Sequence, residues 1–143
     1  GDAEAEKSIG MMCLVGNSHG FTPEHAVKWL MSAAEHGSAD AMMVLGRLSG
    51  SAGEPGDGAA GAEWYRKAAG QYRKAAENGD AEAQHILSEF YERGYGVEKD
   101  EAESVKWLRK AAENGIADAQ FSLGTRYESG LGVQQDRAEA VRW

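Results

Sequence analysis

The sequence repeats itself at a spacing of thirty-six residues. The stretch from Ala81 to Gly115 shares ten or more residues, at one fixed offset, with the stretch that follows it. The first set is Ala81, Ala83, Gln84, Leu87, Tyr91, Gly94, Gly96, Val97, Asp100, Ala102 and Trp107, and the second is Ala117, Ala119, Gln120, Leu123, Tyr127, Gly130, Gly132, Val133, Asp136, Ala138 and Trp143. Composition alone does not give so many matches. A period of this length is typical of stacked arrays, in which each repeat is one supersecondary unit.

The same template extends toward the N-terminus. Ala3 and Ala5 lie thirty-six residues before Ala39 and Ala41, and each tryptophan stands seven residues after a threonine or an aspartate. The pattern therefore predicts a single repeat domain over residues 1–143. Its units are approximately 1–37, 38–79, 80–115 and 116–143, and the last one stops at its tryptophan.

The second unit carries a doubled heptad, WYRKAAG at 64–70 followed by QYRKAAE at 71–77. Seven residues make almost two helical turns, so the extra block rotates the helix face by only about 20°. We expect one long helix from about Gly58 to Asn78, with a bulged loop at Gly70 as the alternative. The preceding stretch, 49–56, lacks a Gly-x-Gly turn and is expected to be the most mobile segment.

Each unit predicts two helices. Glycine recurs within the first helix at Gly10, Gly46 and Gly124. A glycine there costs about 1 kcal/mol relative to alanine, so we expect neighbouring backbones to approach closely at these positions. Gly94 and Gly130 predict left-handed C-caps of the first helix.

The second helix begins at a capping residue. Asp100 with Glu103, and Asp136 with Glu139, have the spacing of an N-cap and its reciprocal third-position carboxylate. Thr22-Pro23 is a capping residue followed by proline at the first helical position. The tryptophan two turns later is expected to wedge between neighbouring helices and units.

Charge excludes one class of partner. A formal charge of −8 argues against nucleic acid, which requires clustered Lys and Arg. It permits a basic partner, with plain solvation of acidic faces as the alternative. No apolar run approaches the roughly 18 residues that span a bilayer, so no membrane insertion is expected.

No motif indicates catalysis or a cofactor. The four histidines, His19, His25, His36 and His85, show no metal-ligand spacing with cysteine or carboxylate, so no metal is expected. The Gly-x-Gly pairs recur at the repeat period, whereas a phosphate loop occurs once and follows a strand. We therefore predict no catalytic residue, no cofactor and no metal site.

Residues 79–115 and 117–143 follow a pattern that reads Ala-x-Ala-Gln-x-x-Leu-Gly-x-x-Tyr-x-x-Gly-x-Gly-Val, then Asp, Ala, Trp and Ala-Ala-x-x-Gly. With this pattern the chain resembles the Sel1-like repeat proteins, which are related to the tetratricopeptide class. The resemblance covers essentially the whole chain. It departs at Ser88, at Cys13, and through most of the loop of the second unit.

The resemblance implies an all-α fold. The expected architecture is a right-handed α-α superhelix of four Sel1-like helix-turn-helix repeats, the last truncated and the second with a seven-residue helix extension. The family implies a non-catalytic scaffold or adaptor that binds a protein or peptide. A cysteine-rich subset is linked to β-lactam binding, but it carries a disulfide in each unit. The single cysteine, Cys13, cannot form those disulfides, so a β-lactam-binding enzyme is the least favoured alternative.

In tetratricopeptide relatives the first helix of each pair lines the concave face. Transfer by offset predicts partner-binding positions at Met11, Met43, Arg47, Glu82, His85, Glu89, Arg93, Asp118, Phe121 and Thr125, with Lys7 and Leu14 on the same face. Apolar residues flanked by charges suit an amphipathic helix or an extended peptide. The alternative is that Met11, Met43 and Phe121 pack against adjacent first helices.

A second function hypothesis is a self-associating segment that stacks end to end, because terminal repeats normally need a polar outer face. Here Gly1 begins a unit without a cap and Trp143 ends one midway. The sequence names no partner and no compartment. Of the soluble locations, a periplasmic or secreted one is favoured over the cytoplasm.

Overall fold

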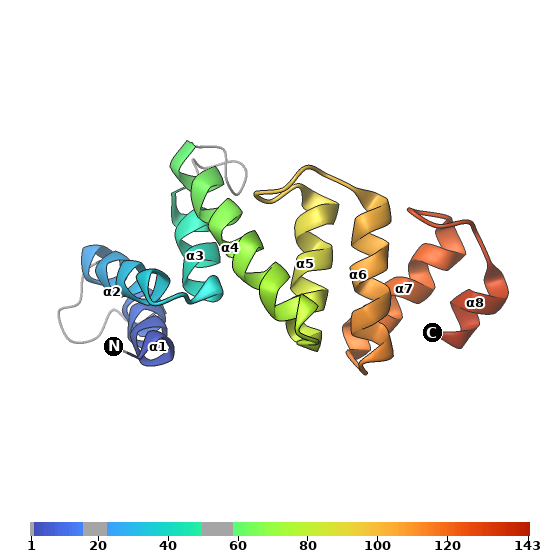
Figure 1. Cartoon of the computed structure of the whole chain (residues 1–143), viewed down its shortest axis with the longest axis horizontal. Coiled ribbons are helices and arrows are strands. Elements are labelled where there is room, and N and C mark those ends of the chain that lie inside the picture. Colours follow the sequence, from blue (N-terminus) through green and yellow to red (C-terminus); the bar gives the residue numbers. More distant parts are fainter. Residues whose placement is uncertain (1, 16–22, 50–58) are drawn as a thin grey trace. The chain divides into compact units, whose positions relative to one another are not determined.

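The computed structural model describes residues 2–15, 23–49 and 59–143, and helices are the only regular elements in these ranges (Figure 1). The helices are α1 (Ala3–Val15), α2 (Pro23–Glu35), α3 (Ala39–Leu48), α4 (Ala59–Glu77), α5 (Ala81–Arg93), α6 (Glu101–Glu113), α7 (Ala117–Ser129) and α8 (Arg137–Arg142). The predicted all-α class is confirmed, and the handedness of the superhelix stays a prediction. The expected cap at Thr22 and residues 50–56 of the expected mobile segment lie outside the described residues.

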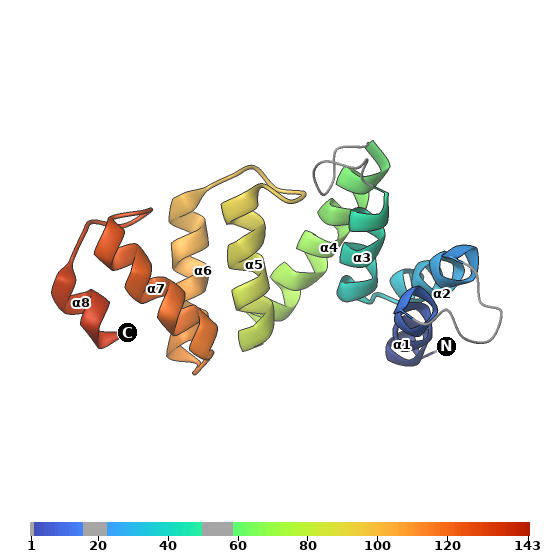
Figure 2. The ribbon, with the colours of Figure 1, turned by 180° about the vertical axis from the view of Figure 1, so that it is seen from behind.

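The helices fall into two compact units, residues 1–71 and 72–143, and α4 runs through the boundary between them. In the first unit α2 contacts both α1 and α3. In the second unit α6 contacts both α5 and α7, and α7 also contacts α8. Figure 2 shows the same consecutive pairs from behind. A second helix such as α2 or α6 therefore joins its own repeat to the next one, as in a stacked array.

Glycine permits a close approach of the two helices in three of the pairs. A Cβ atom built on Gly10 would lie 2.8 Å from Cγ of Leu30, and one on Gly46 would lie 2.9 Å from the ring of Tyr65. At Gly124 the nearest atom would be the carbonyl oxygen of Ala140, at 3.1 Å. The prediction of close contact at these three glycines is confirmed. Since no side chain fits without movement, the helical cost of glycine is offset by packing.

The core of the second unit lies between α6 and α7. Its buried residues are Val105, Leu108, Ala111, Ala112, Ala119, Leu123 and Tyr127, with Ile116, Val133, Ala140 and Trp143 packed against them. Three of these seven are alanines, which allow the two helices to lie close together. Full burial of a leucine side chain such as Leu123 stabilises the fold by about 1.5–3 kcal/mol.

The aspartate caps form as predicted, but the reciprocal contact does not. Asp100 Oδ1 accepts hydrogen bonds from the backbone N–H groups of Ala102 and Glu103, at 2.9 and 3.0 Å. The backbone N–H of Asp100 donates to the carbonyl of Tyr91 at 2.9 Å. That donor is already satisfied, and the Glu103 carboxylate instead pairs with Lys106 at 2.8 Å. The predicted capping box is therefore wrong on its carboxylate side.

The same difference from the prediction is found at the start of α8. Asp136 caps α8 through the N–H groups of Ala138 and Glu139, while its own N–H donates to the carbonyl of Tyr127. Glu139 pairs with Arg142. At the other end of the first helices, Gly94 and Gly130 adopt φ values of 77° and 76°, so the predicted left-handed C-caps are confirmed.

The doubled heptad extends a helix. α4 is 19 residues long, and Gly70 lies inside it with open space where a side chain would be. The prediction of one long helix is confirmed, and the alternative of a bulged loop at Gly70 is wrong. Seven added residues keep the same face inward, because they make almost two complete turns.

The tryptophans are not equivalent. Trp107 is buried, with 6% of its surface exposed, whereas Trp29 is 38% exposed. The prediction that every tryptophan wedges into the interior is therefore wrong for Trp29. In α6 the ammonium group of Lys110 lies 4.2 Å from the Trp107 ring centroid, one turn along the helix. The residue in that place after Trp29 is Ser32, whose short side chain cannot cover an indole ring.

Candidate interaction surface

A groove of about 260 Å³ lies between the two first helices of the second unit, α5 and α7. Its lining residues are His85, Ser88, Glu89, Glu92, Leu108, Phe121, Ser122, Thr125, Arg126, Ser129 and Leu131. Leu108 comes from α6 and Leu131 from the turn after α7, and the others come from α5 and α7. The groove therefore joins the surfaces of the third and fourth repeats.

Four of the predicted partner-binding residues come together in this groove. His85 and Glu89 stand on α5, and Phe121 and Thr125 stand on α7, each one turn apart on its own helix. Phe121 is 78% exposed, and Glu89 and Thr125 are exposed as well, while His85 is half-buried. The exposed ring of Phe121 is the largest apolar group of the lining, and such rings are common anchors of protein interfaces.

Three further predicted residues flank the groove. Glu82 and Asp118 are exposed in the first turns of α5 and α7, where a carboxylate also favours the helix dipole. Arg93 is exposed at the end of α5 and lies 5.9 Å from the ring centroid of Tyr95. The hydrogen bond with the Tyr95 side chain raises the pKa of Arg93, so its charge is permanent.

The remaining predicted residues belong to the first unit. Met11 on α1 and Met43 on α3 are half-buried, and Arg47 on α3 is exposed. They do not line the groove between α5 and α7. Lys7, on the same face of α1, is bound to Asp40 at 2.8 Å and to Glu4 at 2.7 Å. Both partners raise the pKa of Lys7, with the Asp40 hydrogen bond as the larger cause.

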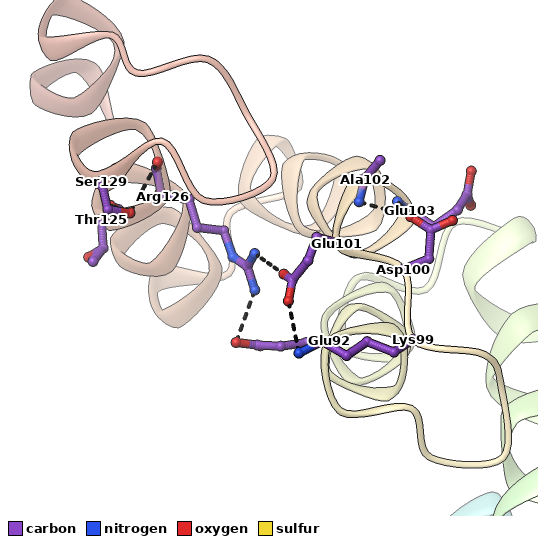
Figure 3. A network of polar contacts seen from close by, with 9 residues as sticks. All are labelled: Glu92, Lys99, Asp100, Glu101, Ala102, Glu103, Thr125, Arg126 and Ser129. Carbon is purple, nitrogen blue, oxygen red and sulfur yellow. Dashed lines mark hydrogen bonds and ion pairs between the residues drawn. The ribbon is translucent and has the colours of Figure 1, made fainter.

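A buried arginine braces one wall of the groove (Figure 3). The guanidinium of Arg126 donates from Nη1 to Oε2 of Glu101 at 2.9 Å and pairs through Nη2 with Oε1 of Glu92 at 3.0 Å. Lys99 approaches the other oxygen of Glu101 at 3.3 Å. The Arg126 hydrogen bond lowers the pKa of Glu101, and that of Lys99 lowers it further. The network joins α7 to α5 and to the start of α6.

Sequence reasoning missed Arg126, and a signal for it exists in the repeat alignment. The equivalent residue of the previous repeat is Phe90, which is 2% exposed and contacts the rings of Tyr72 and Tyr95. A buried arginine in a register position that is otherwise apolar needs counter-charges close by. Glu92 and Glu101 supply them from the neighbouring repeat.

Three of the four hydroxyl groups that line the groove donate hydrogen bonds to helix carbonyls. Ser88 Oγ donates to the carbonyl of His85 at 2.7 Å, and Thr125 Oγ1 to that of Phe121 at 3.0 Å. Ser129 donates to the carbonyl of Thr125 at 2.9 Å. Across the described ranges, no three residues of the types His, Cys, Asp and Glu gather closely enough to hold a metal ion. This arrangement can recognise a ligand by shape and charge.

Two of the three larger hollows of the second unit recur at the repeat period. One, of about 600 Å³, contains Arg109 and Tyr127, and the other, of about 530 Å³, contains Arg73 and Tyr91. In each, the guanidinium donates to the tyrosine hydroxyl and lies 5.7 Å from the ring centroid. These pairs link a second helix to the next first helix, so the hollows follow from repeat stacking.

Membrane insertion finds no support in the helices. No helix in the described part of the chain combines the length and hydropathy needed to cross a bilayer.

Comparison with known proteins gives a family and two similar structures. The family model described as Sel1 repeat matches residues 3–38, 39–71, 72–80, 81–116 and 117–143. A Sel1 repeat protein from Oxalobacter formigenes is similar over 100% of this chain, with 30% sequence identity and a TM-score of 0.71. The protein c5321, a protective antigen of uropathogenic Escherichia coli strains with an SLR fold, is similar over 98% of this chain, with 30% identity and a TM-score of 0.50.

This chain spans 40% of the Oxalobacter protein and 36% of the Escherichia coli protein. No curated protein matches the chain.

Proposed function

The chain belongs to the Sel1 repeat family, and from that premise we propose that it is a non-catalytic interaction module that binds a peptide or protein segment in the groove between α5 and α7. Sel1 repeats usually mediate protein interactions. Repeat arrays bind through side chains displayed along stacked helices, and their specificity lies in a few variable surface residues.

One observation carries the proposal. Phe121 keeps 78% of its surface exposed while forming part of the groove wall, opposite His85 and Glu89 of α5. Exposed aromatic rings beside a hollow are typical of binding sites, because burying such a ring on association releases water from a large apolar surface. The surrounding polar residues would form the rim of the interface.

Catalysis is not part of the proposal. The hydroxyl protons of Ser88, Thr125 and Ser129 are held by helix carbonyls, so none of the three serves as an activated nucleophile in this arrangement. A groove of about 260 Å³ is also smaller than the roughly 300–1,000 Å³ of most small-molecule sites. Its size suits one or two side chains of a larger partner.

The test is to select peptides that bind the full chain from a random phage-displayed library. The affinity of the selected peptides is then measured for two matched variants of the chain. Phe121→Ala should weaken the selected peptides by about tenfold or more, as expected for an aromatic anchor. Met12→Ala is the control, because Met12 is 71% exposed on α1 and does not line the groove. Both side chains are exposed, so thermal melting should be unchanged.

Failure to select any peptide would count against the proposal. Selected peptides that bind Phe121→Ala as tightly as the parent chain would reject this groove as the binding surface.

A further inference from the structure

The arginine of the groove already forms ion pairs within the chain. Arg126 is the only lysine or arginine among the lining residues, all of which are described, and it is 6% exposed. Its guanidinium is held between Glu92 and Glu101 at 3.0 and 2.9 Å. An acidic ligand would have to compete with these two carboxylates for one guanidinium group that is already paired. The groove is therefore poorly suited to an acidic or phosphorylated partner.

The groove wall also carries an exposed carboxylate that can pair with a basic ligand. Glu89 is exposed on the groove wall and forms no ion pair with any residue in the described part of the chain. Its charge is one of the causes that raise the pKa of Arg93, one turn away on α5, after the hydrogen bond with Tyr95 as the largest cause. Glu82 and Asp118 are exposed on the same two helices. The net charge of the chain, −8, adds a long-range attraction for cations.

The apolar part of the groove is equally exposed. Phe121 and Leu131 have 78% and 49% of their surfaces in contact with solvent. Phe121 stands on α7 and Glu89 on α5, so an apolar contact and a carboxylate face each other across the groove. This combination selects a partner that carries both kinds of side chain close together.

We propose that the occupant of the groove is a basic and apolar peptide segment. An aliphatic or aromatic side chain of the segment packs on the rings and methyl groups of Phe121 and Leu131, and a neighbouring lysine or arginine pairs with Glu89. This inference rests on the proposed function, since it names the chemistry of the partner that the groove binds. Opposite charges across an interface mainly set specificity and association rate.

Charge reversal tests the inference on the full chain. The probe is a fluorescein-labelled peptide that carries lysine and leucine residues in a glycine and serine background. One comparison peptide has glutamate in place of lysine, and the other has serine in place of leucine. By fluorescence anisotropy at low salt, the lysine and leucine peptide should bind about tenfold more tightly than either comparison. Its binding should weaken as salt is raised.

Glu89→Lys should invert the preference, so that the glutamate and leucine peptide binds more tightly than the lysine and leucine peptide. Glu113→Lys is the matched control, because Glu113 is exposed on α6 and does not line this groove. It should leave the preference unchanged. Both positions are exposed, and circular dichroism should show both variants folded.

Equal binding of the lysine and glutamate peptides would overturn the inference. So would an equal effect of Glu113→Lys and Glu89→Lys, which would mean that overall charge decides binding. If library peptides bind through Phe121 without a basic residue, the proposed function stands and this inference fails. If no peptide of either kind binds, both fail.

Discussion

The two units of the chain share one repeat pattern but join their repeats with different side chains. In the second unit Arg109 on α6 holds Tyr127 on α7 through the phenol hydroxyl and ring. The equivalent residues of the first unit are Met31 and Ser49, both exposed, and Met31 keeps 43% of its surface in solvent. The repeat pattern therefore places the helices, while a few second-helix residues decide how firmly one repeat is joined to the next.

The two units also differ in the side-chain contact that joins the end of a second helix to the preceding first helix. In the first unit Nδ1 of His36 lies 2.7 Å from Oε2 of Glu6, and in the second unit Nδ2 of Asn114 donates to Oε1 of Gln84 at 2.8 Å. Both links span thirty residues and tie the end of a second helix to the preceding first helix. The geometry is kept, but only the link in the first unit contains groups that titrate.

The largest expected effect on stability comes from replacing a tryptophan by alanine, and it should differ between the two units. Trp107→Ala should lower the free energy of unfolding by about 3–5 kcal/mol, because it removes a side chain that is 94% buried in the second unit. Trp29→Ala should cost about half as much, since more of its ring already contacts water. Guanidinium denaturation followed by circular dichroism measures both. Equal losses of unfolding free energy would show that the different burial of the two tryptophans has no effect on stability.

Removing the buried arginine should come next in size. Arg126→Ala should destabilise the chain by about 2 kcal/mol at neutral pH, less than for a fully buried pair because both carboxylates are partly exposed. The pKa of Glu101 is lowered in the folded state, so its contribution is present above the usual value of 4.5 and is lost as the pH falls through the folded value. Denaturation at pH 7 and pH 3 checks both points.

The matched control for this variant is Arg93→Ala, since Arg93 is exposed and outside the carboxylate network. Loss of its contact with the Tyr95 ring should cost about 0.5–1 kcal/mol at both pH values, less than the loss for Arg126→Ala at neutral pH. A difference between parent and Arg126→Ala that stays constant from pH 7 to pH 3 would remove the electrostatic explanation and leave only packing.

Local signals carried most of the fold prediction. The aspartate caps and the glycine C-caps act within a few residues of chain, and the 36-residue period sets their spacing. All of these caps form as expected. Gly10, Gly46 and Gly124 also behave as expected, because a glycine that costs helix stability has few other reasons to recur.

The misses concern contacts that lie outside the local motifs. Glu103 does not return to its cap because the carbonyl of Tyr91, from the preceding helix, has already taken the N–H of Asp100. Trp29 is exposed, and Ser32 follows it at the place where Lys110 follows Trp107. The repeat offset brought His85, Glu89, Phe121 and Thr125 onto one surface, but it could not reveal the parts of the groove that Arg126 and Leu131 supply.

A smaller effect follows from making the second unit resemble the first. Lys110→Ser places serine after Trp107, as Ser32 follows Trp29, and should cost about 0.5–1 kcal/mol through loss of the cation–π contact. Lys106→Ser is the control, because Lys106 pairs with half-buried Glu103 and not with an indole ring. Acrylamide quenching of tryptophan emission should increase only for Lys110→Ser. Equal quenching in both variants would mean that lysine does not shield the ring.

The smallest expected effect concerns the link that titrates. The hydrogen bond from His36 lowers the pKa of Glu6 below its usual value of 4.5, more than desolvation raises it. The folded pKa is depressed, so the link stabilises the chain above pH 4.5 and this contribution is lost as the pH falls through the folded value. Glu6→Gln, which copies Gln84, should therefore melt below the parent at neutral pH and match it in acid.

The reverse exchange makes this comparison sharper. Gln84 is 4% exposed, and its amide group donates to the carbonyl of Ala76 and accepts from Asn114. Gln84→Glu removes the donor and buries a carboxyl, whose pKa should rise because burial disfavours the charged form. Its melting temperature should fall as the pH rises, opposite in sign to the contribution of Glu6. A difference in melting temperature between Gln84→Glu and the parent chain that does not grow as the pH rises would mean that position 84 accepts a carboxylate as readily as position 6.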